Sequence, residues 1–199
     1  MKKIMFNDKF GLTDAVLEGR KTMTRRIVPQ SVVDNYMYDT DPKITDAARF
    51  KIGDVVAIAQ SYNDVNSGGY PVDSRYDPFR TAYYSVGSVK ESDKGWNNKM
   101  FVRADLMPHH IKITNVRVER LQDCSDDDIL KEGVSQISAP IYRHYNGIGY
   151  TFKGWTERGV ECSSDTPLGA FKALIDKTCG KGTWEKNPLV FVYEFDLFD

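Results

Sequence analysis

The chain has few of the residues that build disulfide frameworks or zinc sites. Its 199 residues include only three cysteines, at positions 124, 162 and 179. They are odd in number, lie far apart and form no Cys-x-x-Cys pair, which argues against both kinds of framework. The three histidines have no cysteine or acidic residue at metal-ligand spacing. We therefore expect no metal, no cofactor and a reducing compartment, the cytoplasm.

Long apolar runs are also missing. The apolar start at residues 1–6 is interrupted by Asn7-Asp8-Lys9 before the core of a signal peptide is complete. No later window reaches the roughly 18 apolar residues that a membrane span needs. The sequence therefore predicts neither export nor a membrane partner.

An excess of charge of one sign is absent as well. The formal net charge is −1, so no global positive field exists to attract polyanions. Any contact with nucleic acid must come from a local patch. With 41% hydrophobic and 28% charged residues, the composition is that of a globular protein. The length fits a single domain over residues 1–199.

The order of the expected elements indicates the fold class. Strands are expected where apolar and β-branched residues cluster, at residues 2–6, 55–59, 111–118 and 189–195. Helices are expected where apolar residues recur at helical spacing or follow a capping residue, at residues 12–19, 125–133 and 166–180. Because no regular βαβ alternation is present, we expect an α+β fold with a mostly antiparallel sheet.

A long insertion is expected at about residues 63–98. This stretch contains Gly68-Gly69, two prolines and several tyrosines but few aliphatic residues. Loops of this length in a compact domain are often lids or binding loops. We interpret it as an insertion into the single domain.

One ten-residue segment carries a family resemblance. Residues 17–26, LEGRKTMTRR, resemble the G-x-K-T-x-T-x-R signature of the ASCH family. Further similar segments, in the same order as in the family, are residues 50–56, 116–121, 131–133 and 184–188. The last two are similar to ASCH proteins of phages and prophages.

The resemblance implies a PUA-like, mostly antiparallel β-barrel with flanking short helices and a cleft for RNA or a modified nucleoside around Lys21 and Thr24. One bacterial branch of the family hydrolyses the amide of N4-acetylcytidine with a lysine, a threonine and a glutamate. Carried over by position, these catalytic residues are Lys21, Thr24 and Glu132.

The chemistry of the three residues can be read in more than one way. Lys21 and Thr24 are three positions apart, so their joint action requires a turn or bulge rather than a regular strand. In an apolar cleft, burial would lower the pKa of Lys21 and let it act as a base. Either Thr24 or a water molecule would then attack the acyl carbon. Glu132 would donate a proton or form an ion pair with the lysine. A lysine and a threonine after a helix end can also simply complement the helix dipole.

Other residues are candidates for contacts with substrate or RNA. The basic segment offers side chains that hold phosphate, although a solvated face is an alternative, and aromatic side chains stack on bases. The candidates are Arg20, Thr22, Arg25, Arg26, Tyr62 and Trp96.

Three functions follow from these patterns. The first is binding of RNA or a modified nucleoside without chemistry. The second is an amidohydrolase of acylated cytidine. The third is a phage-derived interaction module that binds a protein partner through residues 63–98. The sequence leaves the oligomeric state open.

Overall fold

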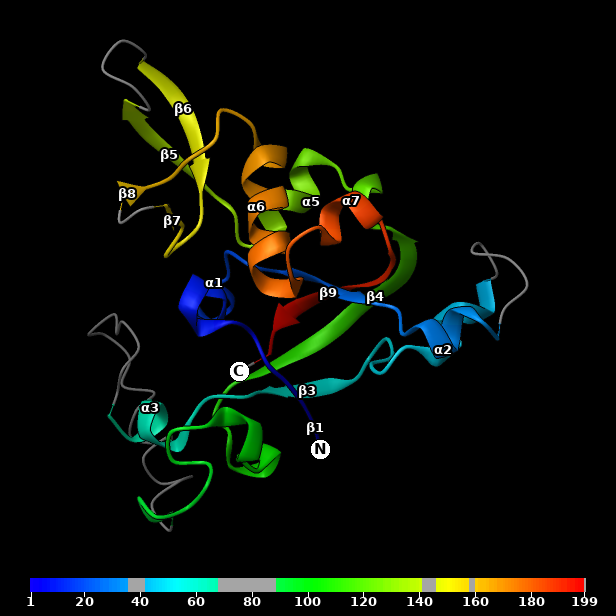
Figure 1. The fold of residues 1–199 in the computed structure, drawn as a ribbon. Coiled ribbons are helices and arrows are strands. Elements are labelled where there is room, and N and C mark those ends of the chain that lie inside the picture. The colour runs from blue at the N-terminus through cyan, green and yellow to red at the C-terminus, as the bar shows by residue number, and fades with distance from the viewer. Residues whose placement is uncertain (36–41, 68–88, 141–145, 158–159, 199) are drawn as a thin grey trace. The chain divides into compact units, whose positions relative to one another are not determined.

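A computed structural model describes residues 1–35, 42–67, 89–140, 146–157 and 160–198 (Figure 1). These residues form a mixed α+β fold, which confirms the predicted class. Five strands form a sheet in the order β1-β3-β4-β9-β2, with bounds Lys2–Ile4, Val55–Ile58, His110–Arg120, Leu189–Leu197 and Met23–Ile27. Among the described residues this sheet is not closed into a barrel, so barrel closure stays a prediction.

The chain divides into two compact units. The first unit comprises residues 1–6, 53–112 and 196–199, and the second comprises residues 7–52 and 113–195. We describe each unit by itself below. The single domain over residues 1–199 stays a prediction.

In the first unit, β3 pairs with β1 on one side and with the start of β4 on the other. β1 pairs with β3 in parallel, with Lys3 opposite Ala57, and β3 is antiparallel to the start of β4, with Val56 opposite Ile111. Its short helices are α3 (Tyr62–Ser67), η3 (Lys99–Phe101) and η4 (Ala104–Leu106). Of the expected insertion, residues 63–67 and 89–98 belong to this unit, and residues 68–88 lie outside the described residues.

The second unit contains the longest described helix, α6, and local sequence signals explain where several of its helices begin and end. Ser125 accepts a hydrogen bond from the Asp128 backbone N–H, and Thr166 accepts one from Gly169, as expected of N-caps. Gly19, with φ of 71°, follows the first helix. The helices are α1 (Leu12–Leu17), α2 (Gln30–Val33), α5 (Asp126–Lys131), α6 (Pro167–Cys179) and α7 (Thr183–Lys186), with short 3-10 turns at Asp8–Phe10, Pro42–Ala47 and Leu121–Asp123.

The packing of the second unit places helices against strands. α5, α6 and α7 pack together, and α5 also contacts β2 (Figure 1). Two antiparallel hairpins that the sequence analysis did not predict complete this unit. They are β5 (Ser135–Pro140) with β6 (Asn146–Thr151), and β7 (Thr156–Glu157) with β8 (Val160–Glu161).

Candidate functional site

The segment before β2 is fixed between two helix ends. Gly19 turns the chain after α1, and the Lys21 N–H then donates to the Ala15 carbonyl at 2.8 Å. The next residue, Thr22, donates from its N–H to the carbonyl of Lys131, the last residue of α5, at 3.0 Å. Backbone bonds therefore hold Lys21 beside the C-terminal end of α5, where Glu132 follows.

The Lys21 ammonium is buried and bonded to Glu132. Its Nζ donates to Glu132 Oε2 at 2.7 Å, to the Glu132 carbonyl at 2.7 Å and to the Met23 carbonyl at 2.8 Å. The Lys21 side chain is only 2% exposed. Burial lowers the pKa of Lys21 below its usual value, because desolvation penalises the charged form, while the Glu132 carboxylate opposes this shift.

Arg25 binds the other oxygen of the same carboxylate. Its Nη1 lies 3.2 Å from Glu132 Oε1, and its Nη2 lies 2.6 Å from Glu119 and 2.9 Å from Asp128. Burial alone would lower the pKa of Arg25, but these carboxylates raise it above its usual value. Arg25 is therefore a firmly charged group whose side chain is 1% exposed.

Arg117 extends the same cluster. Its guanidinium donates to Glu119 at 2.9 Å and to Asp128 at 2.8 Å, and it also pairs with Glu194. The result is a set of linked ion pairs with one more carboxylate than cations. We call it the charge network, and its members are Lys21, Arg25, Arg117, Glu119, Asp128, Glu132 and Glu194.

Thr24 lies on the face of β2 opposite Arg25. Neighbouring side chains of a strand point to opposite faces, so Thr24 and Arg25 project from opposite sides of β2. Thr24 is buried opposite Tyr193 of β9. The structure thus brings Lys21 and Glu132 together across 111 positions of sequence and places Thr24 on the other face of the strand from Arg25.

The remaining candidates in the second unit differ in exposure. Arg20 is exposed and pairs with Glu18 at 2.5 Å. Thr22 is half-buried, and its backbone carbonyl accepts a hydrogen bond from the Phe195 N–H at 2.9 Å. Arg26 is exposed on β2. Of the predicted basic segment, Lys21 and Arg25 are thus bound to buried carboxylates, and Arg20 and Arg26 lie at the surface.

The two aromatic candidates belong to the first unit. Tyr62 is 4% exposed, and its hydroxyl accepts a hydrogen bond from the Arg103 backbone N–H at 2.8 Å. Trp96 is half-buried and packs against the core of that unit. The structure therefore groups Tyr62 and Trp96 apart from the charge network of the second unit.

A small cavity is lined in part by Gly133, which lies close to the Lys21 side chain. Its volume is about 150 Å³, and its lining comprises Phe10, Gly11, Asp14, Glu18, Arg20, Gly133, Ser135 and Lys153. Gly133 adopts a φ of 99°, and a Cβ built there would lie 3.5 Å from Lys21 Cδ. Gly133 therefore belongs both to the lining of this cavity and to the surroundings of the Lys21 stem.

Sequence reasoning missed four members of the network, Glu119, Arg117, Asp128 and Glu194. Two spacings in the sequence could have indicated which of these residues share a face. Arg117 and Glu119 are two apart on a strand and share a face, and Asp128 and Glu132 are four apart at a helix end. Each spacing relates residues within one strand or one helix end. Neither spacing shows that Arg25 links the strand residues to the residues at the helix end.

Neither a metal-ligand cluster nor a membrane-spanning helix is found among the residues that the structure describes. Within them, no group of three or more histidine, cysteine or acidic side chains is arranged to hold a metal ion. In the same ranges, no helix combines the length and apolar character needed to cross a membrane.

Comparison of the chain with models of known protein families, with curated proteins and with solved structures finds no match.

Proposed function

We propose that the chain is an ASCH-type protein of PUA-like fold that binds an acylated nucleoside such as N4-acetylcytidine beside Lys21 and hydrolyses its amide. One observation carries this proposal. Lys21 and Glu132, the residues that the resemblance pairs across 111 positions, form a buried contact of 2.7 Å between Nζ and Oε2. A lysine whose pKa is lowered by burial, bonded to a carboxylate, is a suitable acid–base pair.

In the proposed reaction, Lys21 accepts a proton and Glu132 donates one. Transfer of one proton from Lys21 Nζ to Glu132 Oε2 gives a neutral amine and a neutral acid. The amine takes a proton from water as the water oxygen bonds to the acyl carbon. The acid gives its proton to the N4 nitrogen as the C–N bond breaks. The products are cytidine and acetic acid, which releases its proton to solvent as acetate, and one water molecule is consumed.

Arg25 is a positioning residue in this scheme. It bonds the second oxygen of Glu132 and so fixes the carboxylate against Lys21. Because Arg25 also binds Glu119 and Asp128, its charge is shared among three carboxylates.

The charge balance favours an uncharged nucleoside over an RNA backbone at this site. The network has one more carboxylate than cations, and Arg25 and Arg117 are both bonded to carboxylates. A phosphate at this site would have to displace these carboxylate partners. The position of Thr24 on the opposite face of β2 from Arg25 favours water over Thr24 as the nucleophile.

The small cavity lined in part by Gly133 is the proposed entry for the acylated base. Its volume of about 150 Å³ is below the range of about 300–1,000 Å³ typical of sites that enclose a whole ligand. We therefore assign to it the base and its acyl group, with the ribose outside. A Cβ at Gly133 would lie 3.5 Å from Lys21 Cδ, so the proposed reaction requires the amide to reach Lys21 past this lining residue.

Turnover of N4-acetylcytidine by the purified protein tests the proposal. Lys21→Arg keeps a positive charge that does not deprotonate, and Glu132→Gln keeps the shape of the side chain without its acid–base chemistry. Each is expected to lower the rate of cytidine release by about 100-fold or more. The control Lys172→Ala removes an exposed lysine that pairs with Glu185, and it is expected to keep the wild-type rate.

Two results would contradict the proposal. The first is absence of cytidine release by the wild-type protein, which would leave RNA binding to be tested with Arg26→Ala. The second is full activity in Lys21→Arg, with circular dichroism showing a folded protein. Loss of activity in Thr24→Ala would agree with amide hydrolysis but would identify Thr24, rather than water, as the nucleophile.

A further inference from the structure

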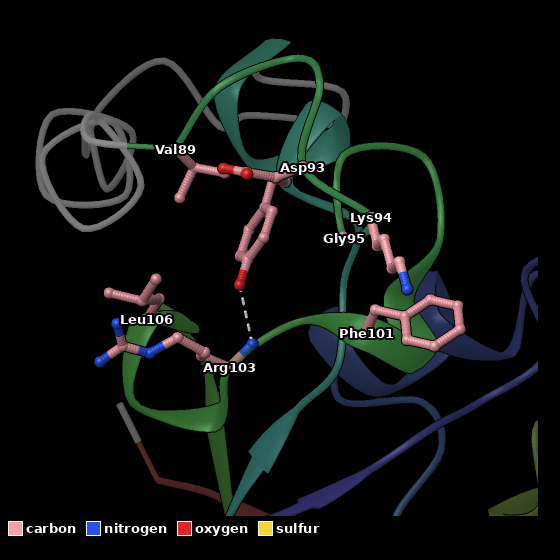
Figure 2. A pocket seen from close by; sticks show the side chains of 8 residues that line it. Val89, Asp93, Lys94, Gly95, Phe101, Arg103 and Leu106 are labelled. Carbon is pink, nitrogen blue, oxygen red and sulfur yellow. Dashed lines mark hydrogen bonds between the residues drawn. The ribbon is translucent and has the colours of Figure 1, made fainter.

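The first unit contains a larger cavity that the charge network does not use. Its volume is about 360 Å³, within the range of about 300–1,000 Å³ typical of small-molecule sites. Figure 2 shows residues of its lining, with Lys94 and Phe101 on one side and Arg103 and Leu106 on the other. All of these residues belong to the first unit, so the cavity can be considered by itself.

Backbone bonds hold three segments of chain around this cavity. At the start of α3, the Tyr62 N–H donates to the Gly95 carbonyl at 3.1 Å, and the Asn63 N–H donates to the Trp96 carbonyl at 2.9 Å. The Arg103 N–H donates to the Tyr62 hydroxyl at 2.8 Å (Figure 2). Tyr62 thus links the segments that carry the other lining residues.

Close packing supports a preformed cavity. A Cβ at Gly95 would lie 2.9 Å from Tyr62 Cδ2, closer than real side-chain contacts, so only glycine fits against the ring. Tyr62 is also part of the buried core of this unit, together with Val65, Val102 and Met107. A ligand would therefore meet a wall that is already ordered.

The lining combines an exposed ring with cations. Phe101 is apolar yet 54% exposed, and Lys94 Nζ lies 5.9 Å from the centre of its ring. Arg103 projects at the other side of the cavity with a side chain that is 68% exposed. An exposed aromatic face next to cations suits a flat ring that carries a negative group.

The carboxylates nearby leave the cations available. Asp105 pairs with Arg103 through Nε and Nη2, but both side chains are exposed, so water screens the pair and an anion can exchange with it. Asp93 accepts a hydrogen bond from the Lys90 backbone N–H at 2.9 Å, which directs one of its oxygens into its own turn. Asp105 binds Arg103 through Nε and Nη2, so the Nη1 donors of Arg103 are the ones assigned to an anion.

We propose that this cavity binds a mononucleotide, with the base against Phe101 beside Lys94 and the phosphate held by Arg103 on the other side of the cavity. The site goes beyond the proposed hydrolysis, since none of its residues belongs to the charge network. Phe101 supplies the flat apolar face, Tyr62 supplies the ordered wall, and Arg103 supplies donors for the phosphate.

Calorimetric titration with cytidine 5′-monophosphate, cytidine and inorganic phosphate tests the site. The monophosphate is expected to bind about tenfold or more tightly than either fragment, because only it uses both the ring and Arg103. Phe101→Ala is expected to weaken binding of the monophosphate about tenfold through loss of stacking. Arg103→Ala is expected to weaken the monophosphate and to reduce the salt dependence of its affinity.

Phe101 and Arg103 are both exposed, so these substitutions leave the buried core intact. Lys172→Ala, a lysine outside the cavity lining, is the matched control and is expected to keep wild-type affinity. Absence of binding at millimolar monophosphate would overturn the proposal. Equal affinities for cytidine and its monophosphate, or unchanged affinity in Phe101→Ala, would overturn it as well. Because no step depends on Lys21, failure here is distinct from failure of the hydrolase.

Discussion

Arg25 in the second unit and Arg103 in the first make ion pairs of nearly equal length in opposite surroundings. The shortest contact of Arg25 is 2.6 Å to Glu119, and that of Arg103 is 2.5 Å to Asp105. Their side chains are 1% and 68% exposed, respectively. Distance therefore says little about what an ion pair does, since solvent exposure sets both its strength and its availability.

The two surroundings suit different functions. In the second unit, buried carboxylates surround Arg25 and fix Glu132 against Lys21, which is what acid–base chemistry requires. In the first unit, the exposed cations exchange partners easily, which is what reversible binding of an anion requires. The comparison predicts that substitutions in the charge network change stability, whereas those at the exposed pair change ligand affinity.

Arg25→Met is expected to have the largest effect on stability. The substitution leaves the buried Glu132 and the half-buried Glu119 and Asp128 without one of their cations. Breaking a buried pair by removing one partner costs about 3–5 kcal/mol of unfolding free energy. Urea denaturation followed by circular dichroism measures this loss.

The matched control is Arg103→Met, which removes the same side chain from an exposed pair. Its denaturation midpoint is expected to stay at the wild-type value, because water already screens the pair. Equal destabilisation by the two substitutions would refute the role that we assign to burial.

Gly95→Ala is expected to have an intermediate effect, confined to the first unit. The new methyl group would meet the Tyr62 ring, and overpacking of this kind costs about 1–3 kcal/mol. The displaced ring would also reshape the wall of the larger cavity, so affinity for cytidine 5′-monophosphate should fall with stability. Urea denaturation and calorimetric titration of the same preparation check both effects. A variant with unchanged stability would show that the ring moves freely, contrary to a preformed cavity.

The smallest expected effect is a dependence of stability on alkaline pH that comes from Lys21. Burial lowers the pKa of Lys21 in the folded protein from its ordinary value of 10.5. Between the folded and unfolded pKa values the unfolded chain binds more protons, so this group makes the unfolding free energy rise with pH. Below that window both states are protonated, and the full desolvation penalty applies.

The comparison with Lys21→Met isolates this contribution. The unfolding free energy of the wild type, relative to that of the variant, should increase as the pH is raised toward 10.5, the ordinary pKa of lysine. Urea denaturation of both proteins at several alkaline pH values measures the difference. A difference that stays constant or falls with pH would show that Glu132 keeps the lysine charged throughout.

Part of the fold could be predicted because its signals are local. The caps Ser125 and Thr166 begin the helices that the sequence predicts, and Gly19 follows the end of the first one. The hairpin of β5 and β6 was missed. Its residues lack regular apolar alternation, so their pairing depends on neighbours rather than on a pattern of their own.

Of the candidate site, the sequence by itself supplied the residue types and one pair, Lys21 with Glu132, through the family resemblance. Only the tertiary structure decided that Arg25 and Arg117 join that pair to three further carboxylates, and that Thr24 faces away from Arg25. The reason is physical. Caps and turns depend on bonds within a few residues, whereas the partners of a buried charge depend on which distant segments pack beside it.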